Sequence, residues 1–291
     1  MPRFTVVIPT YNRPQPLRAC LEAFSHLETP REAWRVIVVN DGGADPWPEI
    51  PNDLSAALPL ERLQTAHRGP AAARNAGARQ ARSDFLAFTD DDCRPLPDWL
   101  DQFERTFATG PWDALAGHAL NAHPSSRGAH AQQYLIDFIQ SYARFTNGDV
   151  YLACSNNVAY RRSVFESLGG FDETFPLAAA EDRELGHRLL ARGYRQRFCS
   201  EARVLHDHPL SAWQYARLQF RYGQGDEHFR RALGRLGLPR RIGQRRRPQF
   251  HWALARTLWL GREPAWMWAL LAVTQMVHFA GSRSERLRRA G

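Results

Sequence analysis

The sequence feature that most restricts the fold is an apolar run that ends in three acids. Phe85-Leu86-Ala87-Phe88-Thr89 leads directly into Asp90, Asp91 and Asp92. A short apolar run bounded by turn-forming residues is typical of a buried strand, and open α/β sheets bind ligands at the carboxyl ends of their strands. The three aspartates are therefore predicted to lie at a strand end, on the ligand-binding edge of such a sheet.

Three adjacent carboxylates need an explanation, because like charges repel. A divalent cation relieves this repulsion, and magnesium is usually held by one or two carboxylates together with substrate phosphates. The alternative is a solvated acidic turn before a helix that starts near Pro97, since acidic turns are common. The triplet alone supports both interpretations, so the residues near it in the fold have to decide.

Strands and helices alternate in the chain before the triplet. The predicted strands span residues 4–8, 34–39, 62–65 and 85–89. Apolar residues at helical spacing follow the first strand, and Gly69-Pro70 opens an alanine-rich helix after the third, with proline at the first helical position. This alternation is typical of a parallel sheet covered by helices, so the sequence predicts an α/β protein with a nucleotide-binding half at residues 1–95.

The chain after the triplet has a different character. Amphipathic helices are predicted at 99–107 and 134–142, strands at 112–120 and 151–160, and a helix at 183–192. Glu181 and Asp182 open that last helix, and Gly193 ends it. Without further context, two acids at a helix amino terminus are explained by the helix dipole, because each favourable charge there stabilises the helix by about 0.3–1 kcal/mol.

Composition narrows the class of protein and its location. All 38 basic residues are arginine, so the formal net charge of +8 partly reflects a compositional bias, although it favours an acidic nucleotide or an anionic membrane face as partner. Four scattered cysteines without a C-x-x-C pair predict neither a zinc site nor a disulfide framework, and they favour a reducing compartment. Met1 leads directly into the first strand without a signal peptide, so a cytoplasmic protein is expected.

Six motifs occur in one order across residues 4–208. They are Val6-Val7-Ile8-Pro9-Thr10-Tyr11-Asn12-Arg13, Val39-Asn40-Asp41-Gly42, Gly69-Pro70 with Arg74-Asn75-Gly77, Asp90-Asp91-Asp92, Gly169-Gly170-Phe171-Asp172-Glu173 and Glu181-Asp182. Together they resemble the inverting glycosyltransferases of family 2. The resemblance implies a GT-A fold over residues 1–210, with an acceptor half at 96–210, and a divalent cofactor, Mn²⁺ or Mg²⁺. It also implies sugar transfer from a nucleoside-diphosphate sugar to a hydroxyl of a glycan, lipid-linked or small-molecule acceptor, as in cell-envelope polysaccharide biosynthesis.

The resemblance assigns donor-side roles to specific residues. The donor-binding residues that it implies are Pro9, Thr10, Tyr11, Asn12, Asp41, Arg74, Asp90 and Asp91. Asp41 would accept a hydrogen bond from the base, which favours uracil or thymine but also suits guanine. Arg74 would approach the phosphates, Asp90 would lie near the ribose, and Asp92 would bind the metal that bridges the diphosphate. Asp91 receives no more specific role.

The remaining motifs carry acceptor-side roles by the same resemblance. Inversion needs one general base for the acceptor hydroxyl, and Asp182 is the candidate, with helix-dipole complementation as the alternative. Glu181 is expected to touch the acceptor. Asn156-Asn157 is either an acceptor-binding pair or an asparagine-rich turn. His206, or else His208, lies where relatives often place a histidine near the metal or the leaving diphosphate, and an ordinary surface histidine is the alternative.

Residues 211–291 are predicted to form a helical, basic extension. Aromatics and arginines interleave at 213–247, but no nucleic-acid-binding module accompanies them, so no nucleic acid partner is expected. Residues 265–280 are mostly apolar and carry Trp266 and Trp268 near one end. This run is shorter than the roughly 20 residues that span a bilayer. It predicts either an interfacial helix that contacts the membrane peripherally or a helix packed on the catalytic domain.

Two other functions remain open at this level. A sugar-phosphate nucleotidyltransferase also combines a nucleotide fold with acidic metal ligands, but a basic glycine-rich loop is missing from the first β-α turn, where Pro9-Thr10-Tyr11-Asn12 stands. A non-catalytic nucleotide-sugar-binding protein would tolerate the loss of Asp92 or Asp182, and both are present.

Overall fold

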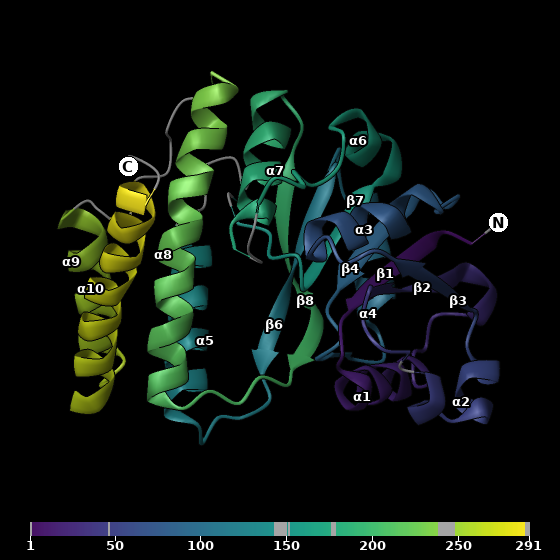
Figure 1. Cartoon of the computed structure of the whole chain (residues 1–291), viewed down its shortest axis with the longest axis horizontal. Coiled ribbons are helices and arrows are strands. Elements are labelled where there is room, and N and C mark those ends of the chain that lie inside the picture. Colours follow the sequence, from purple (N-terminus) through teal and green to yellow (C-terminus); the bar gives the residue numbers. More distant parts are fainter. Residues whose placement is uncertain are drawn as a thin grey trace. The chain divides into compact units, whose positions relative to one another are not determined.

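A computed structural model describes residues 2–45, 47–142, 150, 152–175, 179–237 and 248–288. The chain divides into two compact units (Figure 1). Met1–Ala122 and Ala143–His208 form the first, which we call the sheet unit, and His123–Tyr142 and Pro209–Gly291 form the second, the helical unit. All the candidate site residues predicted from the sequence lie in the sheet unit.

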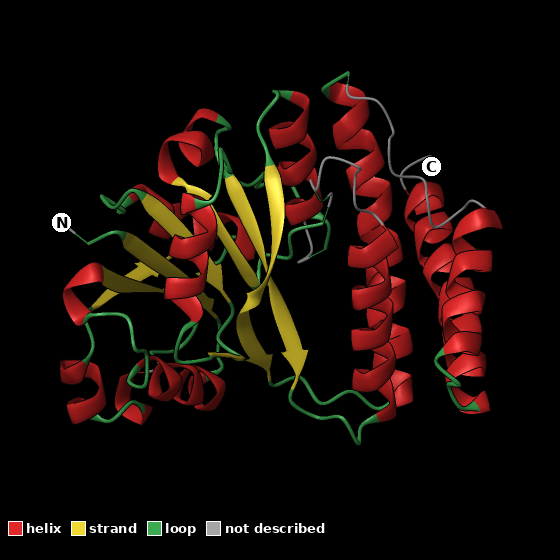
Figure 2. Cartoon of the chain, turned by 180° about the vertical axis from the view of Figure 1, so that it is seen from behind, coloured by secondary structure: helices red, strands yellow, loops and turns green. Residues whose placement is uncertain are grey.

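The sheet unit is built on one mixed, eight-stranded sheet (Figure 2). Its strands are β1 (Phe4–Thr10), β2 (Trp34–Asp41), β3 (Leu60–Thr65), β4 (Phe85–Thr89), β5 (Cys93–Pro95), β6 (Ala114–Asn121), β7 (Asn157–Arg161) and β8 (Gln196–His206), in the order β3-β2-β1-β4-β7-β6-β8-β5. The four amino-terminal strands are parallel, as predicted. β7 runs antiparallel to both β4 and β6. The carboxyl ends of β2, β1 and β4 therefore meet at one edge.

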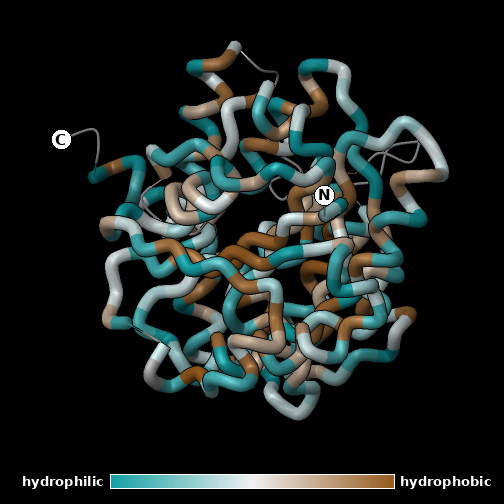
Figure 3. Tube along the Cα trace, turned by 90° about the vertical axis from the view of Figure 1, so that its right-hand side faces the viewer, coloured by the Kyte–Doolittle hydropathy of each residue, from teal (hydrophilic) through white to brown (hydrophobic). Residues whose placement is uncertain are grey.

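Helices cover both faces of this sheet. They are α1 (Pro14–Phe24), α2 (Asn52–Ala57), α3 (Pro70–Arg79), α4 (Trp99–Ala108), α6 (Arg162–Ser167) and α7 (Glu181–Ala191). Side chains alternate across a strand, so Val6 of β1 joins the core under α1 and α4 while Val7 joins the core under α3 and α7. Figure 3 views the chain from the side of this unit and shows hydrophobic segments running through its interior.

Two parts of the sheet differ from the sequence prediction. The strand expected at 151–160 begins only at Asn157, because a turn precedes it, in which the Asn157 amide donates to the Cys154 carbonyl at 3.0 Å. Tyr151 lies outside the described residues. The neighbouring strands β5 and β8 were not predicted, because β5 has only three residues and the exposed polar side chains of β8 hide the strand pattern. β8 nevertheless carries His206 to the edge of the site.

The helical unit consists of α5 (Arg127–Tyr142), α8 (Ala212–Arg235), α9 (Pro248–Leu260) and α10 (Ala265–Arg288). A capping box formed by Ser211 and Gln214 starts α8. α8 and α10 lie side by side (Figure 1), and their backbones approach so closely that a Cβ atom at Gly223 or Gly281 would overlap a carbonyl oxygen of the other helix. Glycine at both positions is thus required for this packing. The arginine-rich stretch 240–247 lies outside the described residues.

α10 has two unlike faces. Met267, Leu271 and Thr274 are buried in the core of the helical unit, whereas Met276 and Phe279 are 64% and 54% exposed. Among the described residues, no helix has the length and apolar character needed to cross a membrane. The apolar run predicted at 265–280 is therefore a helix that packs with one face and exposes apolar side chains on another.

Candidate functional site

The site begins with the aspartate triplet at the end of β4, where the sequence predicted it. Asp91 points inward and is only 3% exposed. Its carboxylate accepts a hydrogen bond from the Thr10 hydroxyl at 2.7 Å and pairs with Arg13 at 2.8 Å. Burial raises the pKa of Asp91 to about 7, although Arg13 and Thr10 oppose this. The middle aspartate thus ties the end of β4 to the end of β1.

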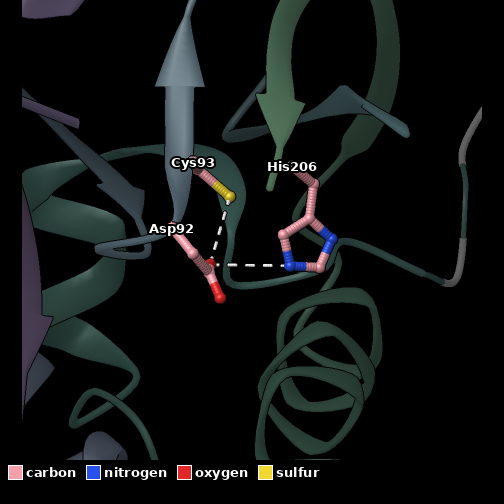
Figure 4. Close-up of side chains that lie close together, drawn as sticks. All are labelled: Asp92, Cys93 and His206. Carbon is pink, nitrogen blue, oxygen red and sulfur yellow. Dashed lines mark hydrogen bonds and ion pairs between the residues drawn. The ribbon is translucent and has the colours of Figure 1, made fainter. Parts of the chain in front are cut away.

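Asp92 faces a different set of groups. One carboxylate oxygen accepts from Arg13 at 2.8 Å, and the other lies 3.5 Å from His206 Nε2 and 3.8 Å from Cys93 Sγ. Figure 4 shows Cys93 of β5 and His206 of β8 pointing toward the carboxylate of Asp92. Burial would raise the pKa of Asp92, but the hydrogen bond and charge of His206, together with Arg13, outweigh burial and hold that pKa below its usual range. Asp92 in turn raises the pKa of His206 against the opposing effect of burial.

This group includes donor atoms that suit a divalent cation. Ligand atoms of Asp92, Cys93 and His206 lie within 4.8 Å of one another. Carboxylate oxygen suits manganese and magnesium, and imidazole nitrogen is a frequent ligand of first-row transition metals. Cys93 is fully buried, and burial raises the pKa of its thiol well above the usual value, so the thiol stays protonated and is a poor ligand. The residues therefore fit Mn²⁺, or Mg²⁺ through Asp92, if phosphate oxygens and water complete the coordination.

A second charged cluster centres on Arg74 of α3, which is 3% exposed. Its guanidinium donates to Asp90 at 2.6 Å and to Glu181 at 3.3 Å, while its Nε and the second Glu181 oxygen have no hydrogen-bond partner. Burial and the adjacent Asp182 raise the pKa of Glu181 to about 7, although the positive charge of Arg74 lowers it. Arg74 thus links the end of β4 to the start of α7. Its predicted contact with donor phosphates stays a prediction.

Asp182 is held at the start of α7 by two backbone amides. Its carboxylate accepts from the Arg183 amide at 2.7 Å and from the Ser155 amide at 3.2 Å. The helix is preceded by Ala180, whose φ of 75° lies in the left-handed region. Burial raises the pKa of Asp182, although these amide bonds oppose the shift. The geometry gives an oriented carboxylate of raised pKa in the first turn of α7, where it also complements the helix dipole, so both predicted roles of Asp182 stay open.

The two asparagines predicted for the acceptor side lie in different surroundings. Asn157 is 1% exposed, accepts from the Trp99 indole at 2.9 Å and donates to the carbonyls of His118 and Ala202. These bonds use its amide to hold the sheet together, so we leave it out of the acceptor site. The Asn156 carbonyl accepts from Thr89 at 2.9 Å, and its side-chain oxygen has no partner. Its acceptor role stays a prediction.

The predicted base-binding residues lie at the ends of β1 and β2. Asp41 accepts from the amides of Arg68 and Gly69 at 3.0 and 2.8 Å and lies 3.0 Å from His67 Nδ1. The Tyr11 ring stacks on His67 with centroids 4.2 Å apart, and Tyr11 is 43% exposed. The result is an exposed aromatic surface beside a carboxylate.

Pro9 and Asn12 frame the loop between β1 and α1. Pro9 pairs in register with Val39 of β2. Asn12 adopts a φ of 53°, and its side-chain oxygen accepts from the Ala44 amide at 2.8 Å. This bond joins the loop after β1 to the loop after β2.

Two residues at this edge had no role in the sequence-based prediction. Arg13 pairs with Asp91 and Asp92, and His67 stacks on Tyr11. Arg13 belongs to the first motif, but its contacts depend on how α1 starts. His67 stands two residues before Gly69-Pro70, with no pattern of its own that would reveal it.

The chain matches the family model for "Glycosyl transferase family 2" over residues 5–169. It is 29% identical over 228 residues to the glycosyltransferase AglE of Haloferax volcanii, covering 77% of this chain and 73% of that protein. It is 35% identical over 211 residues to the pre-mycofactocin glycosyltransferase of Mycobacterium tuberculosis, covering 70% of this chain but only 42% of that relative.

The fold of this chain resembles those of solved structures. A mannosyltransferase from Pyrobaculum calidifontis in complex with GDP-Man and Mn²⁺ superposes with a TM-score of 0.71 at 20% identity, over 98% of this chain and 87% of that one. Residues 1–349 of S. aureus TarS in complex with UDP-GlcNAc superpose with a TM-score of 0.56 at 17% identity, over 99% and 92%.

Proposed function

Because this chain belongs to glycosyltransferase family 2 and has the GT-A fold of its solved neighbours, we propose that it transfers a sugar from a nucleoside-diphosphate sugar to an acceptor hydroxyl with inversion. The predicted GT-A fold and transferase class are confirmed by these comparisons. The donor, the acceptor, the metal and the stereochemistry are our proposal. Its main support is the pair of acidic clusters in the sheet unit, one at Asp92 and His206 and the other at Asp182 at the start of α7.

The proposed chemistry divides the work between these two sites. Asp182 accepts the proton of the acceptor hydroxyl as that oxygen attacks the anomeric carbon. Its two backbone hydrogen bonds fix its orientation, and burial makes it a stronger base than an exposed aspartate. Asp92 and His206 would hold Mn²⁺ or Mg²⁺, which neutralises charge on the departing diphosphate. Glu181 and Asn156 are proposed to face the acceptor.

The donor base is proposed to stack on Tyr11 and to donate its ring N–H to Asp41. This arrangement favours UDP or dTDP, since uracil and thymine offer one imide N–H. Guanine also offers ring donors, and the neighbours include complexes with both GDP-Man and UDP-GlcNAc. A GDP-sugar therefore remains a donor to test.

A donor panel tests this function directly. We expect nucleotide release from one UDP- or dTDP-sugar, dependent on Mn²⁺ and increased by an acceptor, with the opposite anomeric configuration in the product by NMR. Pyrophosphate release from a nucleoside triphosphate and a sugar phosphate would instead identify a nucleotidyltransferase. Tight binding without turnover for every donor and acceptor would favour a binding protein.

We further propose that the enzyme works in the cytoplasm and contacts the membrane peripherally, where a lipid-linked acceptor would be reached. The support is the exposed apolar face of α10, with Val273, Met276 and Phe279. The arginine Arg283 follows on the same helix and is exposed. Apolar side chains next to basic ones are typical of interfacial helices.

Replacing Met276 and Phe279 together by serine should weaken binding to anionic vesicles about tenfold or more, because each side chain loses part of the roughly 1.5–3 kcal/mol that its burial gives. Cosedimentation with phosphatidylglycerol vesicles measures this. Trp213→Ser is the control, because Trp213 is 71% exposed but lies in the first turn of α8. Equal binding by the double variant and the parent protein would exclude this face of α10.

A further inference from the structure

Arg13 bridges two of the three aspartates, although no step of the proposed reaction uses it. Its Nη1 lies 2.8 Å from Asp91 and its Nη2 lies 2.8 Å from Asp92. The two carboxylate side chains are 4% and 8% exposed, whereas the Arg13 side chain is 44% exposed. One guanidinium therefore reaches in from solvent and supplies positive charge to two nearly buried acids.

The contact with Arg13 occupies one carboxylate oxygen of Asp92, the candidate metal ligand. Asp92 gives one oxygen to Arg13, while its other oxygen faces His206 and Cys93 and is the one that a cation could reach without contacting the guanidinium directly. A divalent ion bound there would lie close to the guanidinium, and like charges a few ångströms apart in a partly buried site repel strongly. A cation must therefore share Asp92 with Arg13 or displace it.

We propose that Arg13 is an internal counter-cation that competes with the divalent metal for Asp92 and leaves Asp92 when a donor diphosphate binds. This inference rests on the metal site of the proposed function. A diphosphate offers a guanidinium the same bidentate acceptor geometry as a carboxylate, and the exposed side chain of Arg13 is free to change partner. Metal and nucleotide then bind cooperatively, because each removes an obstacle to the other.

A purely structural arginine would behave in the opposite way. If Arg13 only held Asp91 and Asp92 in position, its removal would disorder the site and weaken metal binding. If Arg13 competes for Asp92, its removal strengthens the binding of metal alone. The sign of the change separates the two roles without any measurement of activity.

The experiment is a titration of Mn²⁺ followed by the EPR signal of the free ion, without nucleotide. Arg13→Gln is expected to bind Mn²⁺ about tenfold more tightly than the parent enzyme, and the gain on adding UDP should be smaller in the variant. Arg18→Gln is the matched control. It removes the same charge from α1, but Arg18 is 52% exposed and pairs with Glu22, so parent affinity is expected.

Two further variants keep the inference testable. Arg13→Lys keeps the charge but cannot form the two-pronged contact, so its Mn²⁺ affinity should lie between those of Arg13→Gln and the parent enzyme. This variant replaces Arg13→Gln in the test if Arg13→Gln does not fold. Unchanged or weaker Mn²⁺ binding in the folded Arg13 variants, with Asp92→Asn still abolishing it, overturns this inference and leaves the metal site standing. Absence of Mn²⁺ binding in the parent enzyme, with and without UDP, overturns both.

Discussion

Asp182→Asn is expected to lower kcat by about 10²–10⁴-fold while UDP affinity and melting temperature stay near those of the parent enzyme. The factor is the typical contribution of general base catalysis. Asparagine keeps the size of the side chain and one oxygen, which can accept from one of the two amides that now donate to separate Asp182 oxygens, but it removes the basicity. Binding and chemistry should therefore separate, which kcat, calorimetric UDP affinity and melting temperature on one preparation will measure.

The pH dependence gives a second measure of the same role. Asp182 accepts a proton only when ionised, and burial raises its pKa. kcat should thus fall as the pH drops through a value above the ordinary aspartate range, and the residual rate of Asp182→Asn should lack this dependence. Because Glu181 is buried beside it, with its own pKa raised to about 7, the profile of the parent enzyme reports the pair.

Asp101→Asn is the matched control for Asp182. Asp101 also lies in the first turn of a helix of the sheet unit, where it accepts from the Thr29 hydroxyl at 2.7 Å. Its replacement should cost a fraction of a kcal/mol of stability and leave kcat unchanged. A kcat near the parent value in Asp182→Asn would return Asp182 to a role in the helix dipole, and a joint loss of UDP affinity would move it to the donor site.

The sequence predicts the fold best where local pattern and tertiary burial agree. β1, β2 and β4 are continuous apolar runs because the parallel sheet buries both of their faces. β8 has no such run, since many of its residues are polar and exposed, and a register irregularity between Gly117 and His118 of β6 interrupts its pairing. Its place in the sheet is a property of the tertiary structure.

The same limit applies to the candidate site. Residues at or just after the ends of strands, such as Asp41 and Asp90, were found because strand ends are visible in the sequence. Their partners were not: Arg13 reaches the triplet from the residue before α1, and His67 reaches Tyr11 from the loop before α3. Asn157 is the opposite case: the sequence suggests a turn or an acceptor-binding residue, whereas its side-chain amide makes three hydrogen bonds within the sheet unit. Side-chain contacts between distant segments have no local signature.

Asp92→Asn is expected to remove the metal dependence of UDP binding. The substitution keeps the shape of the side chain but deletes the charge that faces His206 and the candidate cation position. Loss of a supporting group in a metal site typically lowers metal affinity 10–100-fold, and loss of a charged ligand should cost at least as much. Calorimetric titration of UDP with and without Mn²⁺ measures the effect as the ratio of the two affinities.

Two control variants accompany Asp92→Asn. One shows whether Asp92 acts as a metal ligand or only as a nearby charge, and the other identifies the type of ion. Asp207→Asn removes a charge next to His206, but Asp207 pairs with Arg94 and is 37% exposed, so the metal dependence should persist. Cys93→Ser should also keep it, because a protonated thiol contributes little to a Mn²⁺ site, whereas a thiophilic ion such as Zn²⁺ would lose affinity. If Asp92→Asn retains the parent ratio while Cys93→Ser loses it, Asp92 is not the ligand and the cation is not of the manganese type.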